Sequence, residues 1–201
     1  MLVIGVTGNF GTGKTTVCEI LAELGAHVIS ADDLGHRLRQ KNTPAYKELV
    51  KAFGEGILSE QNEIDRKKLS ALAFKDDASE SRLNKIMHPL ILENVTQQID
   101  ELKRKGAKIV VIEAALLIEA GWRSLVDKVW VTTAPESIII ERLGNQRGYS
   151  EEQVIARLRN QMPAAEKIRY ADVVIDTNRS LPELKKLVTG LWHELQLSLN
   201  H

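Results

Sequence analysis

The sequence predicts an α/β fold, with a parallel sheet and helices on both of its faces. Short apolar runs recur along the chain, and segments with a helical pattern separate most of them, which is the alternation typical of parallel sheets. The runs cover residues 2–6, 26–29, 109–112, 129–131 and 173–175. A chain of 201 residues is long enough for one such domain with insertions and too short for two.

The segments between the apolar runs are mainly helical in pattern. A first helix is expected over residues 14–24, where apolar side chains recur at helical spacing and Gly25 follows. Helical pattern with few strand signals fills about residues 34–105, which indicates an inserted helical subdomain. Breaks in it are expected near Pro44, near residues 54–56 and at Pro89. A second, polar helical stretch covers about residues 136–169.

Composition excludes several classes of protein. Lys plus Arg equals Asp plus Glu at 27 each, so the net charge predicts neither a nucleic-acid partner nor a membrane surface. The first apolar run leads into glycines and a lysine instead of a cleavage site, so we expect the mature chain to start at Met1. The single cysteine, Cys18, fits a reducing compartment. We expect a cytoplasmic protein, either a monomer or a weak homo-oligomer.

A phosphate-binding loop follows the first apolar run. Residues 8–15 fit G-x-x-x-x-G-K-[ST] and lie between a predicted strand and a predicted helix, which is the context that the motif requires. Glycines let backbone N–H groups surround an anion, and the helix N-terminus adds positive partial charge. Lys14 would reach the β- and γ-phosphates, Thr15 would bind Mg²⁺, and Thr16 would lie near the α-phosphate. The expected ATP-binding residues of the loop are Gly8, Gly11, Thr12, Gly13, Lys14, Thr15 and Thr16. The alternative is a glycine turn that only joins strand to helix.

Carboxylates follow two of the expected strands. Asp32 and Asp33 come after a strand, at the end where ligands bind in open α/β sheets. Phosphoryl transfer to an alcohol needs a carboxylate that accepts the hydroxyl proton, and we assign this role to Asp32. Either acid could instead cap the next helix. Glu113 ends another strand, where P-loop proteins carry the acid that contacts Mg²⁺ or its water; the alternative is an exposed acid. The expected Mg²⁺ ligands are Thr15, Asp32 and Glu113, the last directly or through water.

Arginines in the second helical stretch suggest a lid. Arg142 and Arg147 flank Gly144-Asn145, which predicts a short turn, and Gly148 follows. Guanidinium groups bind two phosphate oxygens at once, and a mobile basic lid would exclude water from the transfer. We therefore assign Arg142 and Arg147 to ATP binding, although a solvated helix face is the common alternative. The expected catalytic residues are Asp32, Lys14 and Arg147.

Further motifs follow the loop in a defined order. They are Ile64-Asp65-Arg66 with Leu69 and Phe74, His88-Pro89, Leu116-Leu117-Ile118-Glu119, Arg157 with Gln161, and Ala171-Asp172-Val173-Val174-Ile175-Asp176. Together with residues 4–17 and 28–34, their order and spacing resemble the dephospho-CoA kinase family along nearly the whole chain. The resemblance places Asp32 on the family's catalytic aspartate.

The resemblance implies a fold and a reaction. The fold is a P-loop kinase core with a five-stranded parallel sheet (about residues 1–33, 106–135 and 170–201), a helical substrate subdomain (about 34–105) and a lid (about 136–169). The reaction transfers the γ-phosphate of ATP to the ribose 3′-hydroxyl of dephospho-CoA, which gives coenzyme A and ADP in the last step of coenzyme A biosynthesis. The implied substrate-binding residues are Asp32, Arg66 and His88, although a lone His beside Pro is more often a packing or capping residue.

The sequence also departs from the family pattern. Asn9 and Phe10 replace a usual Gly and Ile, Ala115 replaces a proline, and Glu113 stands where Asp is common. Ser30 replaces an acid before Ala31-Asp32, which weakens the case for a paired acid site.

Three other functions fit parts of the sequence. A GTPase switch would explain the D-x-x-G at residues 32–35, but Asn84-Lys85 is followed by Ile86-Met87 and the guanine-reading N-K-x-D is missing. A nucleoside or nucleotide monophosphate kinase shares the core and lid but not the order of motifs. A non-catalytic nucleotide-binding scaffold would have no need of Asp32 as a base.

Overall fold

The structure is a computed structural model that describes residues 1–199, apart from the side chains of Asp77 and Arg147. The strands are β1 Leu2–Thr7, β2 His27–Ser30, β3 Ile109–Glu113, β4 Lys128–Thr133 and β5 Val173–Asp176. The helices are α1 Lys14–Glu23, α2 Ala31–Leu38, α3 Pro44–Phe53, α4 Arg66–Ala73, α5 Asp77–Arg104, α6 Glu136–Arg147, α7 Glu151–Arg159, α8 Ala164–Ile168 and α9 Leu181–Leu199, with 3₁₀ turns at Glu55–Ile57 and Trp122–Leu125. The chain forms two compact units, Ala31–Gln98 and the remaining described residues.

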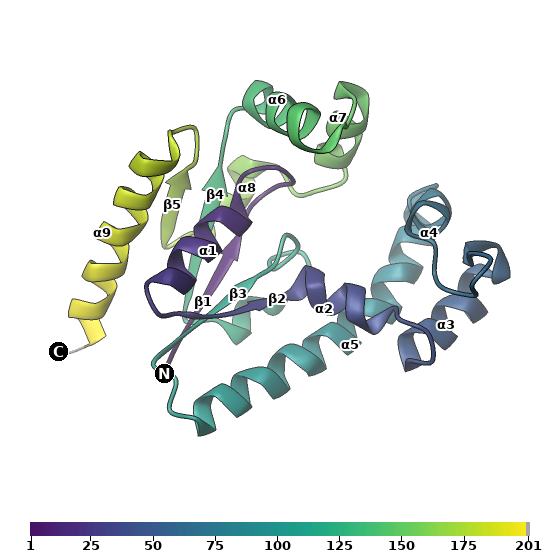
Figure 1. Ribbon diagram of the computed structural model, residues 1–201, viewed down its shortest axis with the longest axis horizontal. Helices are drawn as coiled ribbons and strands as arrows, with labels where there is room; N and C mark the ends of the chain where they lie inside the picture. Colours follow the sequence, from purple (N-terminus) through teal and green to yellow (C-terminus); the bar gives the residue numbers. More distant parts are fainter. Residues whose placement is uncertain (200–201) are drawn as a thin grey trace. The chain divides into compact units, whose positions relative to one another are not determined.

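The strands form one parallel sheet in the order β2-β3-β1-β4-β5 (Figure 1), which confirms the predicted α/β class and the five expected strands. The register pairs Glu113 with Val6 on one side and with Ser30 on the other. The carboxyl ends of β1, β2 and β3 therefore lie together at one edge of the sheet, and the loop after β1 starts there.

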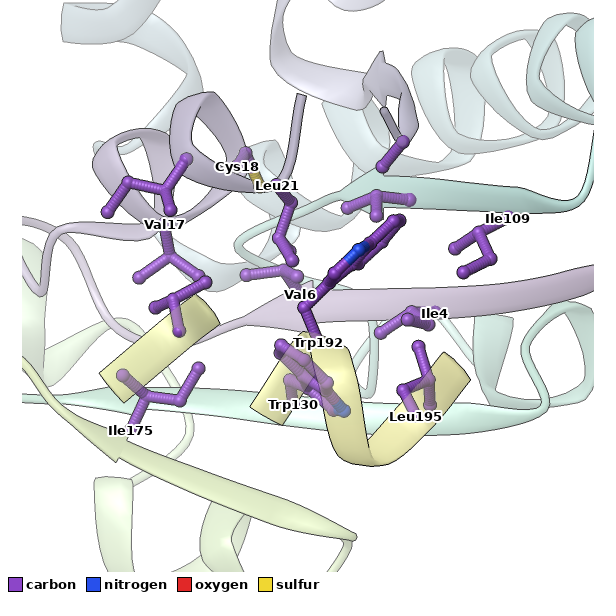
Figure 2. Packing of buried hydrophobic residues seen from close by; sticks show 14 of the residues in the cluster. Ile4, Val6, Val17, Cys18, Leu21, Ile109, Trp130, Ile175, Trp192 and Leu195 are labelled. Carbon is purple, nitrogen blue, oxygen red and sulfur yellow. The ribbon is translucent and has the colours of Figure 1, made fainter. Parts of the chain in front are cut away.

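The main core lies between one face of the sheet and the helices α1 and α9. Figure 2 shows Ile4 and Val6 of β1 among Val17 and Leu21 of α1 and Trp192 of α9. All five side chains are buried. Burying one large apolar side chain contributes about 1.5–3 kcal/mol, so this cluster fixes where α1 begins relative to the sheet. The position of the loop between β1 and α1 follows from that packing.

On the opposite face of the sheet, Gly5 lets the segment after β3 approach closely. A Cβ at Gly5 would lie 2.5 Å from Leu117 Cδ1 and 3.2 Å from Val126 Cγ1. Apolar side chains therefore pack against this face of the sheet as well. In the part of the chain that the structure describes, no helix is long and apolar enough to cross a bilayer.

The helical unit Ala31–Gln98 has an apolar core of its own. Ala45, Leu49, Ile57, Leu69, Ala73 and Met87 form this core and are all buried. Thr43 caps α3 through the N–H of Tyr46, with Pro44 in the first turn, and Asp65 caps α4 through the N–H groups of residues 67 and 68. Side-chain caps of this kind fix where each helix begins.

The predicted helix break at Pro89 is wrong, because α5 continues through it from Asp77 to Arg104. Proline removes one backbone hydrogen bond from a helix interior, at a cost of about 3 kcal/mol. Met87 is buried in the core of this unit, and Leu83, Leu90 and Ile91 pack against it. Each such side chain contributes about 1.5–3 kcal/mol when buried, so the packing on both sides of Pro89 outweighs the missing bond.

The second helical stretch forms α6, α7 and α8, but the predicted turn at Gly144-Asn145 is wrong. Helix α6 runs through both residues to Arg147 and is capped by Gly148, which has φ 67° and donates its N–H to Gly144 O. A glycine inside a helix costs about 1 kcal/mol. Leu143 is buried in a cluster with Ile139 of the same helix, and that packing offsets the cost.

Candidate active site

The loop between β1 and α1 has the backbone that the phosphate-binding motif predicts. Gly8, Gly11 and Gly13 have φ of 149°, 79° and 80°, a region that favours glycine. A Cβ at Gly8 would lie 2.3 Å from Thr132 Oγ1, and one at Gly11 would lie 2.7 Å from Ile139 Cγ2. Gly13 also precedes α1 and has no side chain to cap the first N–H groups of that helix. The N-terminus of α1 therefore offers N–H donors to an anion.

Lys14 folds back over this loop. Its Nζ donates to the carbonyl oxygens of Gly8 at 3.0 Å and Asn9 at 3.1 Å, and the residue is buried. These bonds hold the ammonium against the loop, where phosphate oxygens would surround it.

Thr15 and Glu113 place two oxygen ligands beside the start of α1. Thr15 Oγ1 donates to Glu113 Oε1 at 2.7 Å, and Glu113 is only 6% exposed. The alternative of an exposed acid at the end of β3 therefore does not hold. A hydroxyl and a carboxylate are hard oxygen ligands of the kind that Mg²⁺ prefers.

Three threonines support the loop, and of these the sequence predicts only Thr12 as a site residue, whereas Thr132 and Thr177 were missed. Thr12 Oγ1 donates to Asn9 O at 2.7 Å and shares a 2.8 Å hydrogen bond with Thr132 Oγ1 at the end of β4. Thr177 Oγ1, after β5, lies 2.9 Å from Thr12 O, to which it donates. All three are buried. Their only signal in the sequence is that Thr132 and Thr177 end or follow apolar runs, where the polar edge of a parallel sheet is expected.

Of the two expected lid arginines, only the side chain of Arg142 is described. Its Nη1 donates to Thr177 Oγ1 at 3.1 Å and its Nη2 to Thr177 O at 2.6 Å. Helix α6 is thereby tied to the loop after β5, and through Thr177 to the P-loop. Arg147 is the last residue of α6, but its side chain lies outside the described part of the chain, so its assignment stays a prediction. Thr16, another predicted ATP-binding residue, is half-buried in the first turn of α1.

Asp32 and Asp33 both lie in the first turn of α2, directly after β2, and are exposed. Negative charge at a helix N-terminus interacts favourably with the helix dipole. Both carboxylates can therefore stabilise α2, so the capping alternative and the proposed base role of Asp32 are compatible.

The helical unit also contains a cluster of cationic side chains around His36. Arg39 Nη2 is hydrogen-bonded to His36 Nδ1, and Arg39 Nε donates to Gly35 O at 2.9 Å. A guanidinium only donates, so His36 Nδ1 accepts and the imidazole is neutral. Burial, followed by the positive charges of Arg39 and Arg66, lowers the pKa of His36 below its ordinary value. The carboxylates of Asp32 and Asp33 raise that pKa as smaller contributions, and the nearby cations Arg39 and Arg66 favour an anionic ligand.

The other predicted substrate residues occupy two helices of that unit. Arg66 is exposed and is the first residue of α4, after its cap Asp65. His88 is half-buried within α5, next to Pro89. Arg66 was expected from the sequence, but His36 and Arg39 were missed. Arg39 directly follows α2, in which His36 lies, and a spacing of three residues at the end of a helix could have indicated that they are neighbours.

Comparison with known proteins gives the family. Residues 2–183 match the family described as CoaE, dephospho-CoA kinase. The chain belongs to the dephospho-CoA kinase family. The dephospho-CoA kinase of Dehalococcoides mccartyi is 43% identical over 194 residues, which cover 96% of this chain and 98% of the relative. That of Aquifex aeolicus is 42% identical over 195 residues, with 96% of each chain covered.

A solved structure agrees with this assignment. The dephospho-CoA kinase from Campylobacter jejuni is 27% identical, covers 96% of both chains and has a TM-score of 0.69. The protein is therefore an ATP-dependent phosphotransferase of the dephospho-CoA kinase family.

Proposed function

We propose that this protein transfers the γ-phosphate of ATP to the ribose 3′-hydroxyl of dephospho-CoA and gives coenzyme A and ADP. The observation that carries the proposal is the family match over residues 2–183, because the P-loop alone would serve any acceptor. Within this proposal, residues 136–169 act as a lid and the helical unit binds the acceptor.

ATP would bind with its phosphates on the P-loop. The N–H groups at the start of α1 would bind oxygens of the β-phosphate, with Lys14 at the β- and γ-phosphates. Gly8, Gly11, Gly13 and Thr12 would shape the loop. Arg142, held on Thr177, and Arg147 would bind the nucleotide from the lid side, where closure excludes water from the transfer.

Mg²⁺ fits the oxygens beside the loop. When it binds with ATP it uses one or two protein carboxylates and keeps several waters and phosphate oxygens among its other ligands. Thr15 and Glu113 offer a hydroxyl and a carboxylate oxygen, and we add Asp32 as a third ligand. Among residues 1–199, no three His, Cys, Asp or Glu side chains gather into a metal-binding group, and an Mg·ATP site does not require one. Bound Mg²⁺ would neutralise charge on the β- and γ-phosphates.

Asp32 is the proposed base. The reaction forms the bond between O3′ of the ribose and the γ-phosphorus, breaks the bond from the γ-phosphorus to the bridging oxygen, and releases ADP. Asp32 would accept the proton of the 3′-hydroxyl, because this carboxylate follows the carboxyl end of β2 by two residues. Lys14 would stabilise the charge that develops on the phosphoryl oxygens.

The acceptor would bind to the helical unit. Dephospho-CoA carries a diphosphate, and the cations around His36 give that unit a place for an anion, with Arg66 and His88 as the proposed contacts. The free thiol of Cys18 is compatible with our expectation of a cytoplasmic location. The proposal includes no nucleic-acid or membrane partner and assumes a monomer or a weak homo-oligomer.

A test of acceptor specificity decides this proposal. The purified protein is incubated with Mg·ATP and, separately, with dephospho-CoA, AMP or adenosine; ADP release is followed and the product is identified by mass and chromatography. We expect rapid ADP release only with dephospho-CoA, because binding energy from the remote pantetheine and diphosphate orients the hydroxyl. Equal turnover of AMP, or a phosphate at another position than 3′, would refute the acceptor but leave a P-loop kinase.

A further inference from the structure

The segment between α7 and α8 contacts the P-loop at two of its variable positions. The backbone N–H of Phe10 donates to Gln161 Oε1 at 2.7 Å. The side-chain amide of Asn9 donates from Nδ2 to Met162 O at 3.1 Å. Neither contact involves a residue to which the proposed function gives a role. The segment therefore binds the loop itself and leaves the start of α1 to the phosphates.

The same segment is also held by an ion pair whose lysine is fully buried. Met162 N donates to Glu119 Oε1 at 3.2 Å, and Lys167 Nζ lies 2.9 Å from the same oxygen. Lys167 Nζ also donates to Ala115 O at 2.6 Å, and its side chain is fully buried. Met162, which accepts from Asn9, is thus bonded to Glu119, and the buried Lys167 holds that carboxylate in place.

The aromatic ring of Phe10 has contacts outside the P-loop too, in addition to the hydrogen bond of its N–H. The guanidinium of Arg157 lies 5.0 Å from the centre of the Phe10 ring and 4.7 Å from that of Tyr149. The two rings meet edge to face with centroids 5.5 Å apart. Arg157 is four residues before Gln161, so one turn of chain contacts both the ring and the backbone of Phe10.

We propose that Gln161 is a positioning residue for ATP, acting through the N–H of Phe10, and that Arg157 supports it through the Phe10 ring. Three glycines at positive φ leave this loop many conformations in the unfolded or loose state, and ordering each residue opposes binding by about 1–2 kcal/mol. A loop that is already held in the binding shape avoids part of that loss when ATP arrives. The Phe10 N–H bonds to Gln161 and the Thr12 N–H bonds to Asn9 O. The N–H groups that follow, at the start of α1, are then directed at the phosphates.

The test compares Gln161→Leu with Gln153→Leu. Both remove a glutamine from the same part of the chain, but Gln153 bonds to Ser150 in the capping box of α7. The affinities for Mg·ATP and Mg·ADP are measured by calorimetry without acceptor, together with melting temperatures. Because Gln161→Leu leaves the Phe10 N–H without its acceptor, we expect about tenfold weaker nucleotide binding. We expect Gln153→Leu to bind nucleotide like the unaltered protein.

A charged variant separates loop shape from electrostatics. Gln161→Glu keeps an oxygen that can accept from the Phe10 N–H but adds a negative charge near the phosphates. Its loss of affinity should shrink as salt is raised, because salt screens the charge, whereas the loss in Gln161→Leu should not. If both losses depended on salt alike, the positioning role would be refuted.

Steady-state kinetics distinguish a positioning role from a purely structural one, which would change neither KM for ATP nor kcat. With dephospho-CoA as acceptor, Gln161→Leu should raise KM for ATP and lower kcat, since the loop contacts the phosphates in both the ground and the transition state. Affinity within twofold of the unaltered protein, or an equal loss in Gln153→Leu, would overturn the inference. The inference rests on ATP use within the proposed function but not on its acceptor: if dephospho-CoA failed as acceptor while Gln161→Leu still weakened Mg·ATP binding, only the proposed reaction would fall.

Discussion

Replacing Lys167 by methionine should destabilise the protein strongly. The Lys167 ammonium is fully buried, pairs with Glu119 Oε1 at 2.9 Å and donates to Ala115 O at 2.6 Å. Methionine fills a similar volume, so the main loss is electrostatic: the Glu119 carboxylate loses its partner. Removing one member of a buried pair destabilises a protein by about 3–5 kcal/mol. Because Glu119 keeps a side-chain exposure of 22%, water compensates in part and we expect the lower end, about 3 kcal/mol.

Thermal unfolding followed by circular dichroism measures this loss. In a chain of this size, 1 kcal/mol lowers Tm by about 2–4 °C, so Lys167→Met should melt about 6–12 °C lower. Lys185→Met is the matched control, because Lys185 also pairs with a glutamate, Glu23, but the two side chains are 55% and 60% exposed. Exposed pairs contribute about 0–1 kcal/mol, so this variant should melt within a few degrees of the unaltered protein.

A second substitution tests the assigned cause. If the unpaired carboxylate is responsible, adding Glu119→Gln to Lys167→Met should recover part of the lost stability, since no charge is then left without a partner. An equal drop for Lys167→Met and Lys185→Met would refute the reasoning. So would a double variant that is less stable than Lys167→Met alone.

Four further predictions address the site. Lys14→Ala should lower turnover about a hundredfold or more while circular dichroism shows an intact fold, because a stabiliser of developing charge is removed; near-normal turnover would contradict the P-loop assignment. Asp32→Asn should lower kcat far more than it raises KM for ATP, and Asp33→Asn should do much less; steady-state kinetics showing the reverse order would mean the base is misassigned. Arg147→Ala should weaken catalysis, and Arg147→Lys should restore it only in part, because an ammonium cannot bind two oxygens in a planar fork. Full rescue by lysine in the same assay would mean that only the long-range charge of Arg147 matters. Folding lowers the pKa of His36, so below the ordinary value of 6.5 the unfolded chain binds more protons than the folded chain. The free energy of unfolding therefore falls as the pH drops below that value. Urea unfolding at several pH values should show a flatter profile for His36→Gln, and an unchanged profile would refute this contribution.

The parts of this structure that could be predicted from the sequence are those encoded locally. Each strand is a short apolar run, and the P-loop is a contiguous motif between a strand and a helix. The hydrophobic pattern and the motif were therefore sufficient to predict these parts. The two wrong predictions, breaks at Pro89 and at Gly144-Asn145, came from local propensity as well. They failed because burial of neighbouring side chains such as Met87 and Leu143 outweighs a local cost of about 1–3 kcal/mol.

The supports of the site could not be predicted, because they join segments far apart in the chain. Thr12 meets Thr132 across 120 positions, Thr177 meets Thr12 across 165, and Gln161 meets Phe10 across 151. Single polar residues carry no periodic signal, and their partners are set only once the sheet order is known. The motif predicts a phosphate ligand for the loop, whereas the tertiary fold determines which residues hold the loop in place.

The two loop positions that depart from the family pattern are also the two that contact the segment after α7. A glycine in place of Asn9 would have no side-chain amide to donate to Met162 O, and an aliphatic residue in place of Phe10 would offer no ring to Arg157. Larger side chains at these positions add contacts from outside the loop without changing its glycines at residues 8, 11 and 13, whose positive φ values shape the anion site. The glycines are constrained by their positive φ values, whereas at Asn9 and Phe10 the loop carries side chains that contact its supports.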